Sequence, residues 1–282
     1  MGDDTSGLTC LLGSFGDLRL ESGNRMQDIQ SSPSDVSIAI DRVGIKSLRL
    51  PLTVKDRERG RQNTVAEVDL AVDLPAQFKG THMSRFVEAL ESWDGQLDYH
   101  GFRELVAGVR GRLEAKNAHV TVRFPYFVRR ASPVSGAVSN MDYACTVHGD
   151  LTGDKFRITL GVEVPVMTVC PCSLAISAQG AHSQRTIVRA RCRFKGFVWL
   201  EELIRMAEAS GSSPVYALLK REDEKHVTEA AFEKPCFVED VARSMAQALE
   251  QHESVTWYAV EAESFESIHN HCAFAGIERE KG

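Results

Sequence analysis

The chain has 282 residues and a formal net charge of -6, with 43% hydrophobic and 26% charged residues, which is ordinary for a globular protein. The negative charge excludes a general attraction for nucleic acid or anionic membranes, so a polyanionic ligand would have to be bound by a local cluster of Lys and Arg. No apolar run approaches the roughly 20 residues of a membrane span, and the N-terminal segment lacks the basic start and apolar core of a secretory signal.

The first half of the chain predicts the order strand, strand, helix, helix, strand, strand. Alternating apolar residues indicate strands over residues 43–50 and 64–74, and the run KDRERGRQN between them indicates a turn. Apolar residues recur at helical spacing from Met83 to Trp93, with Thr81 as the expected N-cap, and again from Phe102 to Leu113. Strand patterns return over residues 119–128 and 140–148.

The second half predicts the same order again. We expect strands over residues 156–169 and 185–194, helices over residues 199–209 and 237–249, and a strand over residues 254–263. The polar segment 210–235 predicts a long loop between the two helices. The pattern indicates an α+β fold of two tandem ββααββ modules, residues 28–150 and 151–282, after a disordered tail over residues 1–27.

Open antiparallel sheets with helices on one face leave their edge strands unpaired. We therefore expect the chain to form a homo-oligomer in which sheets of different copies meet edge to edge. Seven cysteines, an odd number spread over a long chain, do not suit a secreted disulfide scaffold. They predict reduced thiols and a cytoplasmic protein.

The stretch VCPCSLAISAQGAH, residues 169–182, brings two cysteines and a histidine close together. Cys170 ends an apolar strand and Pro171 stops the ladder, so we expect the thiols of Cys170 and Cys172 to emerge at a sheet edge. With His182 after a Gly-containing loop, the pattern favours an open metal site with three protein ligands over a four-ligand structural site, because there is no CxxC knuckle. Cysteines that only fill the core and a redox pair are the alternatives.

A second group of candidate residues lies near the C-terminus, in ESFESIHNH, residues 263–271. If this segment is extended, His269 and His271 point to the same face, and Glu266 lies three residues before the first of them. Such a pair can move protons or bind a metal, although an exposed polar strand end explains it equally well.

Carboxylates form the third group. Glu222, Asp223 and Glu224 fall in the predicted loop, while Glu239 and Asp240 fall in the first turn of the last helix. Carboxylates in a first turn usually stabilise the helix dipole, which suits Asp240, whereas Glu239 can also anchor a ligand.

A helix start is predicted within LPAQFKGTHMSRF, residues 74–86, which contains Lys79, His82 and Arg85. Backbone N–H groups at a helix start favour anions, so these residues are a candidate phosphate site, although surface basic residues at such positions are commoner than phosphate sites.

Taken together, GTHMSRF, CPCS followed by GAHSQR, LLKREDEKHVTE, FVEDVAR and ESFESIHNH resemble, in order and spacing, the type IB GTP cyclohydrolases. The resemblance covers about residues 28–275. GTHMSRF alone also resembles the related NADPH-dependent nitrile reductases of queuosine synthesis, so that activity is the enzymatic alternative, and a noncatalytic zinc-stabilised oligomer is the third reading. The resemblance implies a homotetrameric barrel of tunnelling-fold modules that converts GTP and water to 7,8-dihydroneopterin triphosphate and formate, the first step of tetrahydrofolate synthesis.

The resemblance also implies roles for individual residues. Cys170, His182 and Glu224 match the ligands of one divalent metal ion, which is zinc, manganese or iron. Glu239 matches the carboxylate that anchors guanine, and Glu266, His269 and His271 match the C-terminal active-site cluster. Cys170 is counted with these three as a catalytic residue. Lys79, His82, Arg85 and Arg185 are nominated for the triphosphate. Cys172 has no ligand role, and we expect it to tune Cys170 or to pair with it on oxidation.

Overall fold

The computed structural model describes residues 29–281, so the predicted tail over residues 1–27 lies outside the described residues. Within this range the strands and helices follow one another along the chain in this order: β1 (Ile40–Asp56), β2 (Gly60–Leu74), α1 (Met83–Glu91), β3 (Gln96–Leu97), α2 (Tyr99–Arg112), β4 (Asn117–Ala131), β5 (Val138–Thr152), β6 (Lys155–Val169), α3 (Pro171–Ile176), β7 (Ser183–Phe194), α4 (Leu200–Ser210), β8 (Ser213–Pro214), α5 (Arg221–Glu233), α6 (Val238–Gln251), β9 (Val255–Phe265) and β10 (Cys272–Glu280).

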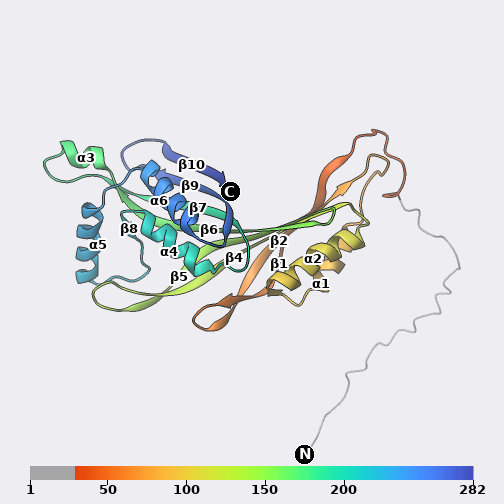
Figure 1. Ribbon diagram of the computed structural model, residues 1–282, viewed down its shortest axis with the longest axis horizontal. Coiled ribbons are helices and arrows are strands. Elements are labelled where there is room, and N and C mark those ends of the chain that lie inside the picture. Colours follow the sequence, from red (N-terminus) through yellow and green to blue (C-terminus); the bar gives the residue numbers. More distant parts are fainter. Residues whose placement is uncertain (1–28, 282) are drawn as a thin grey trace, which may run out of the picture.

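All of these strands belong to one sheet with the order β10-β9-β7-β6-β5-β4-β2-β1-β3, and β8 pairs with β6. Neighbouring strands are antiparallel, except that the short β3 runs parallel to β1. The expectation of two open sheets in one chain is therefore wrong, because β5 pairs with β6 and joins both halves into a single sheet (Figure 1). The predicted α+β class, with an antiparallel sheet and helices on one side, is confirmed.

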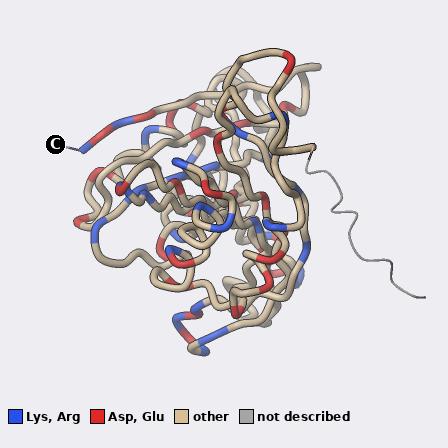
Figure 2. The backbone as a smooth tube through the Cα atoms, turned by 90° about the vertical axis from the view of Figure 1, so that its right-hand side faces the viewer, with Lys and Arg blue, Asp and Glu red and all other residues tan. Residues whose placement is uncertain are grey.

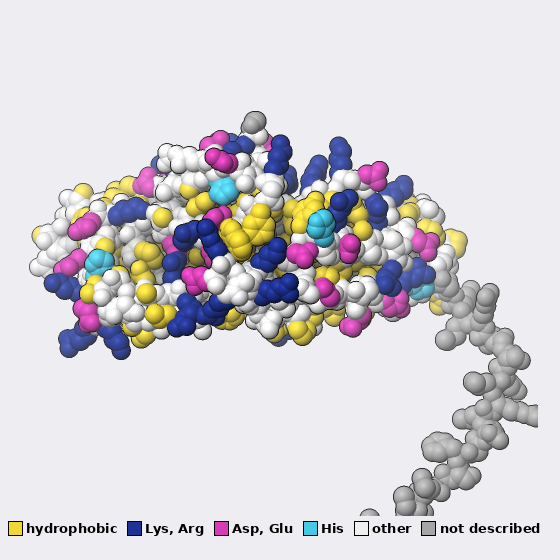
Figure 3. Space-filling model, turned by 60° about the horizontal axis from the view of Figure 1, so that its bottom comes forward, with side chains coloured by type: hydrophobic (Ala, Val, Ile, Leu, Met, Phe, Trp, Pro, Cys, Tyr) yellow, Lys and Arg dark blue, Asp and Glu magenta, His cyan; other side chains and the backbone are white. Residues whose placement is uncertain are grey.

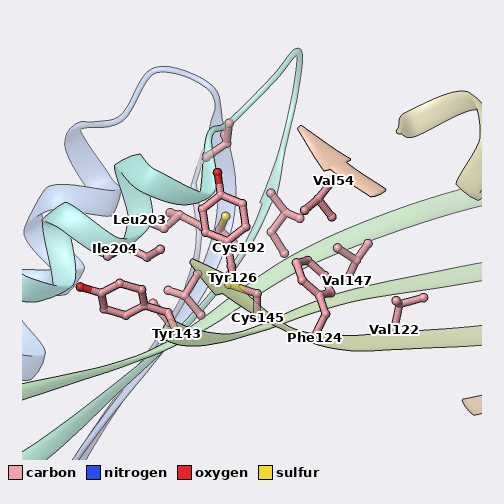
Figure 4. Close-up of a cluster of buried hydrophobic side chains, with 14 of the residues drawn as sticks. Val54, Val122, Phe124, Tyr126, Tyr143, Cys145, Val147, Cys192, Leu203 and Ile204 are labelled. Atoms are coloured by element: carbon pink, nitrogen blue, oxygen red, sulfur yellow. The ribbon is translucent and has the colours of Figure 1, made fainter. Parts of the chain in front are cut away.

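The core lies between the sheet and these helices. Strand residues alternate between buried and exposed, and the buried set includes Tyr126 on β4 and Tyr143 on β5 (Figure 4). Leu203 and Ile204 of α4 pack over these rings, and both are at most 1% exposed. The hydroxyl of Tyr143 donates to the buried carboxylate of Glu208 over 2.5 Å, so its polar end is satisfied inside the core.

Several predicted boundaries change. The turn between β1 and β2 covers only residues 57–59, because the Asp56 carboxylate accepts the N–H groups of Glu58 and Arg59 at 2.9 and 2.8 Å. Gly60 then takes a positive φ of 79°, which allows β2 to begin at once. The predicted Thr81 cap of α1 is wrong: His82 occupies the N-cap position and makes no side-chain cap bond.

The segment predicted as a loop over residues 210–235 contains helix α5, so that prediction is wrong. Asp223 and Ala231 are the buried residues of α5, so the helix lacks the broad apolar stripe that would have revealed it. It is stabilised at its start instead, where the backbone N–H of Lys220 donates to the carboxylate of Asp223 over 2.8 Å.

The C-terminal strand β10 was not predicted, and it forms one edge of the sheet. Its sequence gives little signal because it buries no side chain fully, and Phe274 is 74% exposed. The residues between β9 and β10, including His269 and His271, form a bend and not the extended segment that was expected.

Charged residues of both signs are interspersed along the chain (Figure 2). In Figure 3, basic and acidic side chains alternate across one face, and hydrophobic side chains are exposed near its middle. Among residues 29–281, none of the helices combines the length and apolar composition that a membrane span requires.

Candidate active site

Cys170 and His182 lie together where the ends of β6 and β7 meet. The backbone N–H of Cys170 donates to the carbonyl of His182 over 3.1 Å. The last pair of the β6–β7 ladder, Val169 with Ser183, directly precedes this contact. Because β6 is flanked by β5 and β7, the two residues lie at the end of interior strands and not at a sheet edge as predicted.

The thiol of Cys170 caps helix α3. Its Sγ accepts the backbone N–H of Ser173 at 3.4 Å, and Pro171 occupies the first helical position, where no N–H is needed. An N–H group pointing at sulfur stabilises negative charge there, which suits a metal ligand. Cys172 lies on α3, is exposed, and is free, like Cys170.

The ring of His182 is held by its Nδ1 atom. The amide oxygen Oε1 of Gln184 lies 2.8 Å from Nδ1 and can only accept, so Nδ1 is the donor, and in the neutral ring this tautomer leaves the lone pair on Nε2. Ligating histidines are commonly fixed in this way by a second residue. Ser267, in the β9–β10 bend, has its Oγ 3.5 Å from the same Nδ1 atom, which places the C-terminal bend beside His182.

The two C-terminal histidines form a stacked pair. The ring centroids of His269 and His271 are 5.2 Å apart and their planes differ by 15°, so the predicted side-by-side arrangement is present although the strand is not. Both rings are exposed, and Glu266 at the start of the bend is partly buried. Arg185 on β7 is exposed and lies opposite Phe265, the last residue of β9.

Glu224 is exposed on the first turn of α5. Phe232 of this helix packs against Gly180 in the loop before His182, with about 3.5 Å between the ring and an added Cβ at that glycine. Glu224 is eight residues earlier, about 12 Å along the helix axis. Within the described residues, Cys170, His182 and Glu224 are not brought within 4.8 Å of one another.

The residue between the two exposed glutamates of α5 has a different function. Asp223 is fully buried and accepts hydrogen bonds from the N–H groups of Val134, Ser135 and Lys220 and from the Ser135 hydroxyl, at 2.6 to 2.9 Å. Burial alone would raise the pKa of Asp223, but the hydrogen bonds, led by that from Ser135, hold it well below its usual range. Asp223 therefore fastens the β4–β5 hairpin to α5 and is not available as a ligand.

Cys236 lies close to the same strand end, because its N–H donates to the carbonyl of Val169 over 3.1 Å. Burial raises the pKa of the Cys236 thiol, and its Sγ lies 3.2 Å from the hydroxyl of Ser212. A buried neutral thiol of this kind is a structural group and not a further ligand.

Glu239 and Asp240, in the first turn of α6, differ in their contacts. Asp240 accepts the N–H of Phe237 at 3.1 Å and pairs with Arg243 at 3.2 Å, so it caps the start of α6, a role that was not predicted beside the dipole interaction. Glu239 is exposed, and within the described residues it has no hydrogen bond or ion pair, so it is available to a ligand.

The predicted phosphate residues around α1 lie at the other end of the molecule. Lys79 pairs with Asp35 at 3.2 Å, and Arg85 contacts the carbonyl of Arg112 and the carboxylate of Glu114. His82 directly precedes α1. Figure 1 places α1 and α2 at one end of the long axis and α3 and α5 at the other, so one chain does not bring these three residues to Cys170.

Sequence reasoning did not identify Gln184 and Ser267, which contact His182, or a cluster of His119, His148 and Asp150 on β4 and β5. One signal for this cluster was the period-2 spacing of His148, the last residue of the predicted strand 140–148, and Asp150, which lies two residues beyond the predicted end.

A family model described as type I GTP cyclohydrolase folE2 matches residues 26–275. Proteins named GTP cyclohydrolase FolE2 from Maridesulfovibrio salexigens and Geobacter sulfurreducens are 60% and 48% identical to this chain, each over 91% of it and over 100% and 99% of their own length. Among solved structures, a uricase from Arthrobacter globiformis superimposes with a TM-score of 0.51 at 12% identity, covering 86% of this chain and 94% of that one. This last likeness concerns the fold alone.

Proposed function

Since the chain belongs to the folE2 family of type I GTP cyclohydrolases, we propose that it is a metal-dependent enzyme of the type IB group, acting as a homotetramer. It is a GTP cyclohydrolase of folate biosynthesis, and the observation that carries this is the 60% identity to a FolE2 protein over its full length. The reaction takes GTP and water to 7,8-dihydroneopterin triphosphate and formate. The reductase and noncatalytic alternatives have no comparable support. A cytoplasmic location stays a prediction from the composition.

The residues at the β6–β7 end fit a divalent metal ion. A thiolate that accepts a backbone N–H and an imidazole whose Nε2 lone pair is free are two ligands of the kind that zinc, manganese or iron accept together with a carboxylate. Cys170, His182 and Glu224 would hold the ion, with Glu224 joining when the metal binds and the chains assemble. When bound, the ion would lower the pKa of a coordinated water toward neutrality, which supplies the nucleophile for attack on C8 of guanine.

The bend between β9 and β10 provides the acid and base groups. Opening the imidazole ring, releasing formate and closing the pterin ring require several proton transfers, each worth about 10²- to 10⁴-fold with a well-placed group. His269 and His271 are stacked and exposed, and the contact of Ser267 with His182 places their bend beside the proposed ligands. These two imidazoles and Glu266 donate and accept the protons in this proposal.

Glu239 selects guanine. Its ionised carboxylate can accept both the N1–H and the exocyclic amine of guanine in a bidentate pair, whereas adenine offers no proton at N1. The neighbouring Asp240 is occupied by the cap of α6, so the two acids are not interchangeable.

The active site takes residues from two chains in this proposal. Lys79, His82 and Arg85 lie at the opposite end of the long axis from Cys170, so a second copy must bring them to the triphosphate, with Arg185 from the first. The sheet supports such assembly, because β10 and β1 are edge strands and β3 covers only Thr53 and Val54 of β1.

The test is to incubate the purified protein with GTP and each of Zn²⁺, Mn²⁺ and Fe²⁺, following formate release and pterin fluorescence. GTP-dependent formate that a chelator suppresses is the expected result, with Cys170→Ala as the inactive control. NADPH consumption with a nitrile substrate would favour the reductase, and a folded, metal-containing protein with no turnover would favour the noncatalytic oligomer.

A further inference from the structure

A second group of side chains of the types that bind metals lies on β4 and β5, and it includes none of the proposed ligands Cys170, His182 and Glu224. His119 is directly opposite Asp150 in the ladder, and Thr121 is opposite His148. Their neighbours Ala118, Val120, Val147 and Leu151 are buried under the helices. Gly149, between the two β5 residues, faces α2 so closely that an added Cβ would lie 2.7 Å from the ring of Phe102. Because strand side chains alternate, the cluster projects from the opposite, helix-free face of the sheet.

The three side chains converge on one point. One ligand atom from each of His119, His148 and Asp150 lies within 4.8 Å of the others. The same carboxylate oxygen, Oδ1 of Asp150, is 2.5 Å from Nδ1 of His119 and 3.0 Å from Nε2 of His148. Two ring nitrogens therefore approach a single carboxylate oxygen. A small cation could bind between the three groups in place of these hydrogen bonds with little movement of the side chains.

A hydrogen bond to Thr121 fixes the orientation of the His148 ring. Oγ1 of Thr121 lies 2.8 Å from Nδ1 of His148, so Nε2 is the nitrogen that faces Asp150. A hydrogen bond from the far nitrogen to a second residue is the usual support of a metal-ligating histidine. The only other charged side chain recorded on Asp150 within the described residues is Arg42, at 3.9 Å and 61% exposed, which can swing away at little cost.

Two imidazoles and one carboxylate, with the remaining directions open, form the ligand set of many zinc and non-haem iron sites. We propose that His119, His148 and Asp150 form a second metal site that binds one zinc-class divalent cation on the helix-free face of the sheet. The cation links β4 to β5, and water fills its open positions. The site shares no residue with Cys170, His182 and Glu224, so it does not depend on the proposed function.

The test measures metal content of the full-length protein after loading with Zn²⁺ and dialysis. Asp150→Asn and His148→Ala should each lower the content by about one equivalent per chain, whether or not the active-site metal is present. His252→Ala is the matched control, because His252 also pairs with a carboxylate, that of Glu202 at 3.6 Å, but belongs to no three-residue cluster among the described residues. It should leave the content unchanged.

The Cys170→Ala variant separates this proposal from the proposed function. Loaded with Co²⁺, it should keep one ion whose spectrum lacks a thiolate charge-transfer band, and adding His148→Ala should remove that ion. Circular dichroism checks that each variant is folded. Unchanged metal content in folded Asp150→Asn, or no metal in folded Cys170→Ala, would overturn the second site. If Cys170→Ala binds as much metal as the wild type, Cys170 is not a metal ligand. That result would overturn the proposed active-site metal without affecting the second site.

Discussion

The backbone amide of Cys170 is hydrogen-bonded to the carbonyl of His182 at 3.1 Å, which brings together two residues that are separated by helix α3 and a loop. This bond continues the β6–β7 ladder by one step beyond Val169 and Ser183. The relative position of the two proposed ligands is thus set by the sheet, so we expect the thiol and imidazole to be in place before a metal binds.

Removing the carboxylate of Glu224 should abolish metal-dependent activity, whereas removing that of Glu222 should not. Both residues are exposed on the first turn of α5, so the pair is matched in position and exposure. We expect Glu224→Ala to lower kcat/KM by at least about 100-fold, because one of three ligands is lost. Formate release and metal content, measured for both variants, show which of the two glutamates is the metal ligand. Equal losses would show that Glu224 is not the ligand.

Gln184→Ala should weaken metal binding without unfolding the protein. The amide oxygen of Gln184 fixes the proton on Nδ1 of His182, and loss of such a support typically costs 10- to 100-fold in metal affinity. Competition with a coloured chelator gives the affinity. Gln179→Ala is the control, since Gln179 is exposed and its recorded bond uses only its backbone N–H. An unchanged affinity for Gln184→Ala would mean that His182 is oriented by other contacts.

Two inactive variants should restore each other if the active site takes residues from two chains. Arg85 lies on α1 and Cys170 caps α3, and these two helices lie at opposite ends of the molecule in Figure 1. Mixed and refolded together, Cys170→Ala and Arg85→Ala should give about one quarter of wild-type activity, because each half of a shared site is then intact about half the time. Either variant mixed with itself stays inactive. Activity no higher than in these self-mixtures would place both sets of residues in the same chain.

Neighbouring acids of α6 should give opposite phenotypes. Glu239→Ala should raise KM for GTP strongly and leave thermal stability unchanged, because its carboxylate is exposed and free among the described residues. Asp240→Ala should lower the free energy of unfolding by about 1 kcal/mol through loss of the cap to Phe237, with KM little changed. Steady-state kinetics and denaturant unfolding test both variants, and unaltered GTP affinity in Glu239→Ala would eliminate it as the guanine anchor.

Stability should depend on pH through Asp69. Burial raises the pKa of this carboxyl, but the hydrogen bonds from Arg123 and from the N–H of Ser47 outweigh burial and hold it below the usual 3.8. A pKa lowered in the folded state stabilises the protein above pH 3.8, and this stabilisation is lost as the pH falls through the folded value. Since Arg123 is 46% exposed, we expect only about 1 kcal/mol.

The measurement compares wild type with Asp69→Asn in denaturant titrations at neutral pH and near pH 3. Wild type should lose more stability on acidification than the variant, which has no carboxyl to protonate. Parallel curves for the two proteins would show that the Asp69 contacts do not stabilise the fold.

Much of the fold could be predicted because long strands with one buried face leave a period-2 pattern, as in β2, where buried and partly exposed residues alternate. Helix α5 could not, since its burial is limited to Asp223 and Ala231. The sequence also did not indicate which of the three consecutive acids on α5 is buried, because burial of Asp223 depends on contact with a hairpin about 90 residues earlier. The short spacing and the family resemblance grouped Cys170 with His182 in one predicted site, but the support from Gln184 and Ser267 required the folded chain.

The hydrogen bonds of Asp223 with Val134 and Ser135 also determine whether the chain can be split into two fragments that fold separately. They tie a turn from the part before residue 150 to a helix from the part after it, and Ser132 strengthens the link by donating its hydroxyl to the carbonyl of Leu218 over 2.7 Å. A fragment ending at residue 150 would lack this anchor for its β4–β5 hairpin. In the complementary fragment, the carboxylate of Asp223 would lose three of its four hydrogen-bond donors. We therefore expect that neither half folds stably as a separate fragment and that the two must be made as one polypeptide.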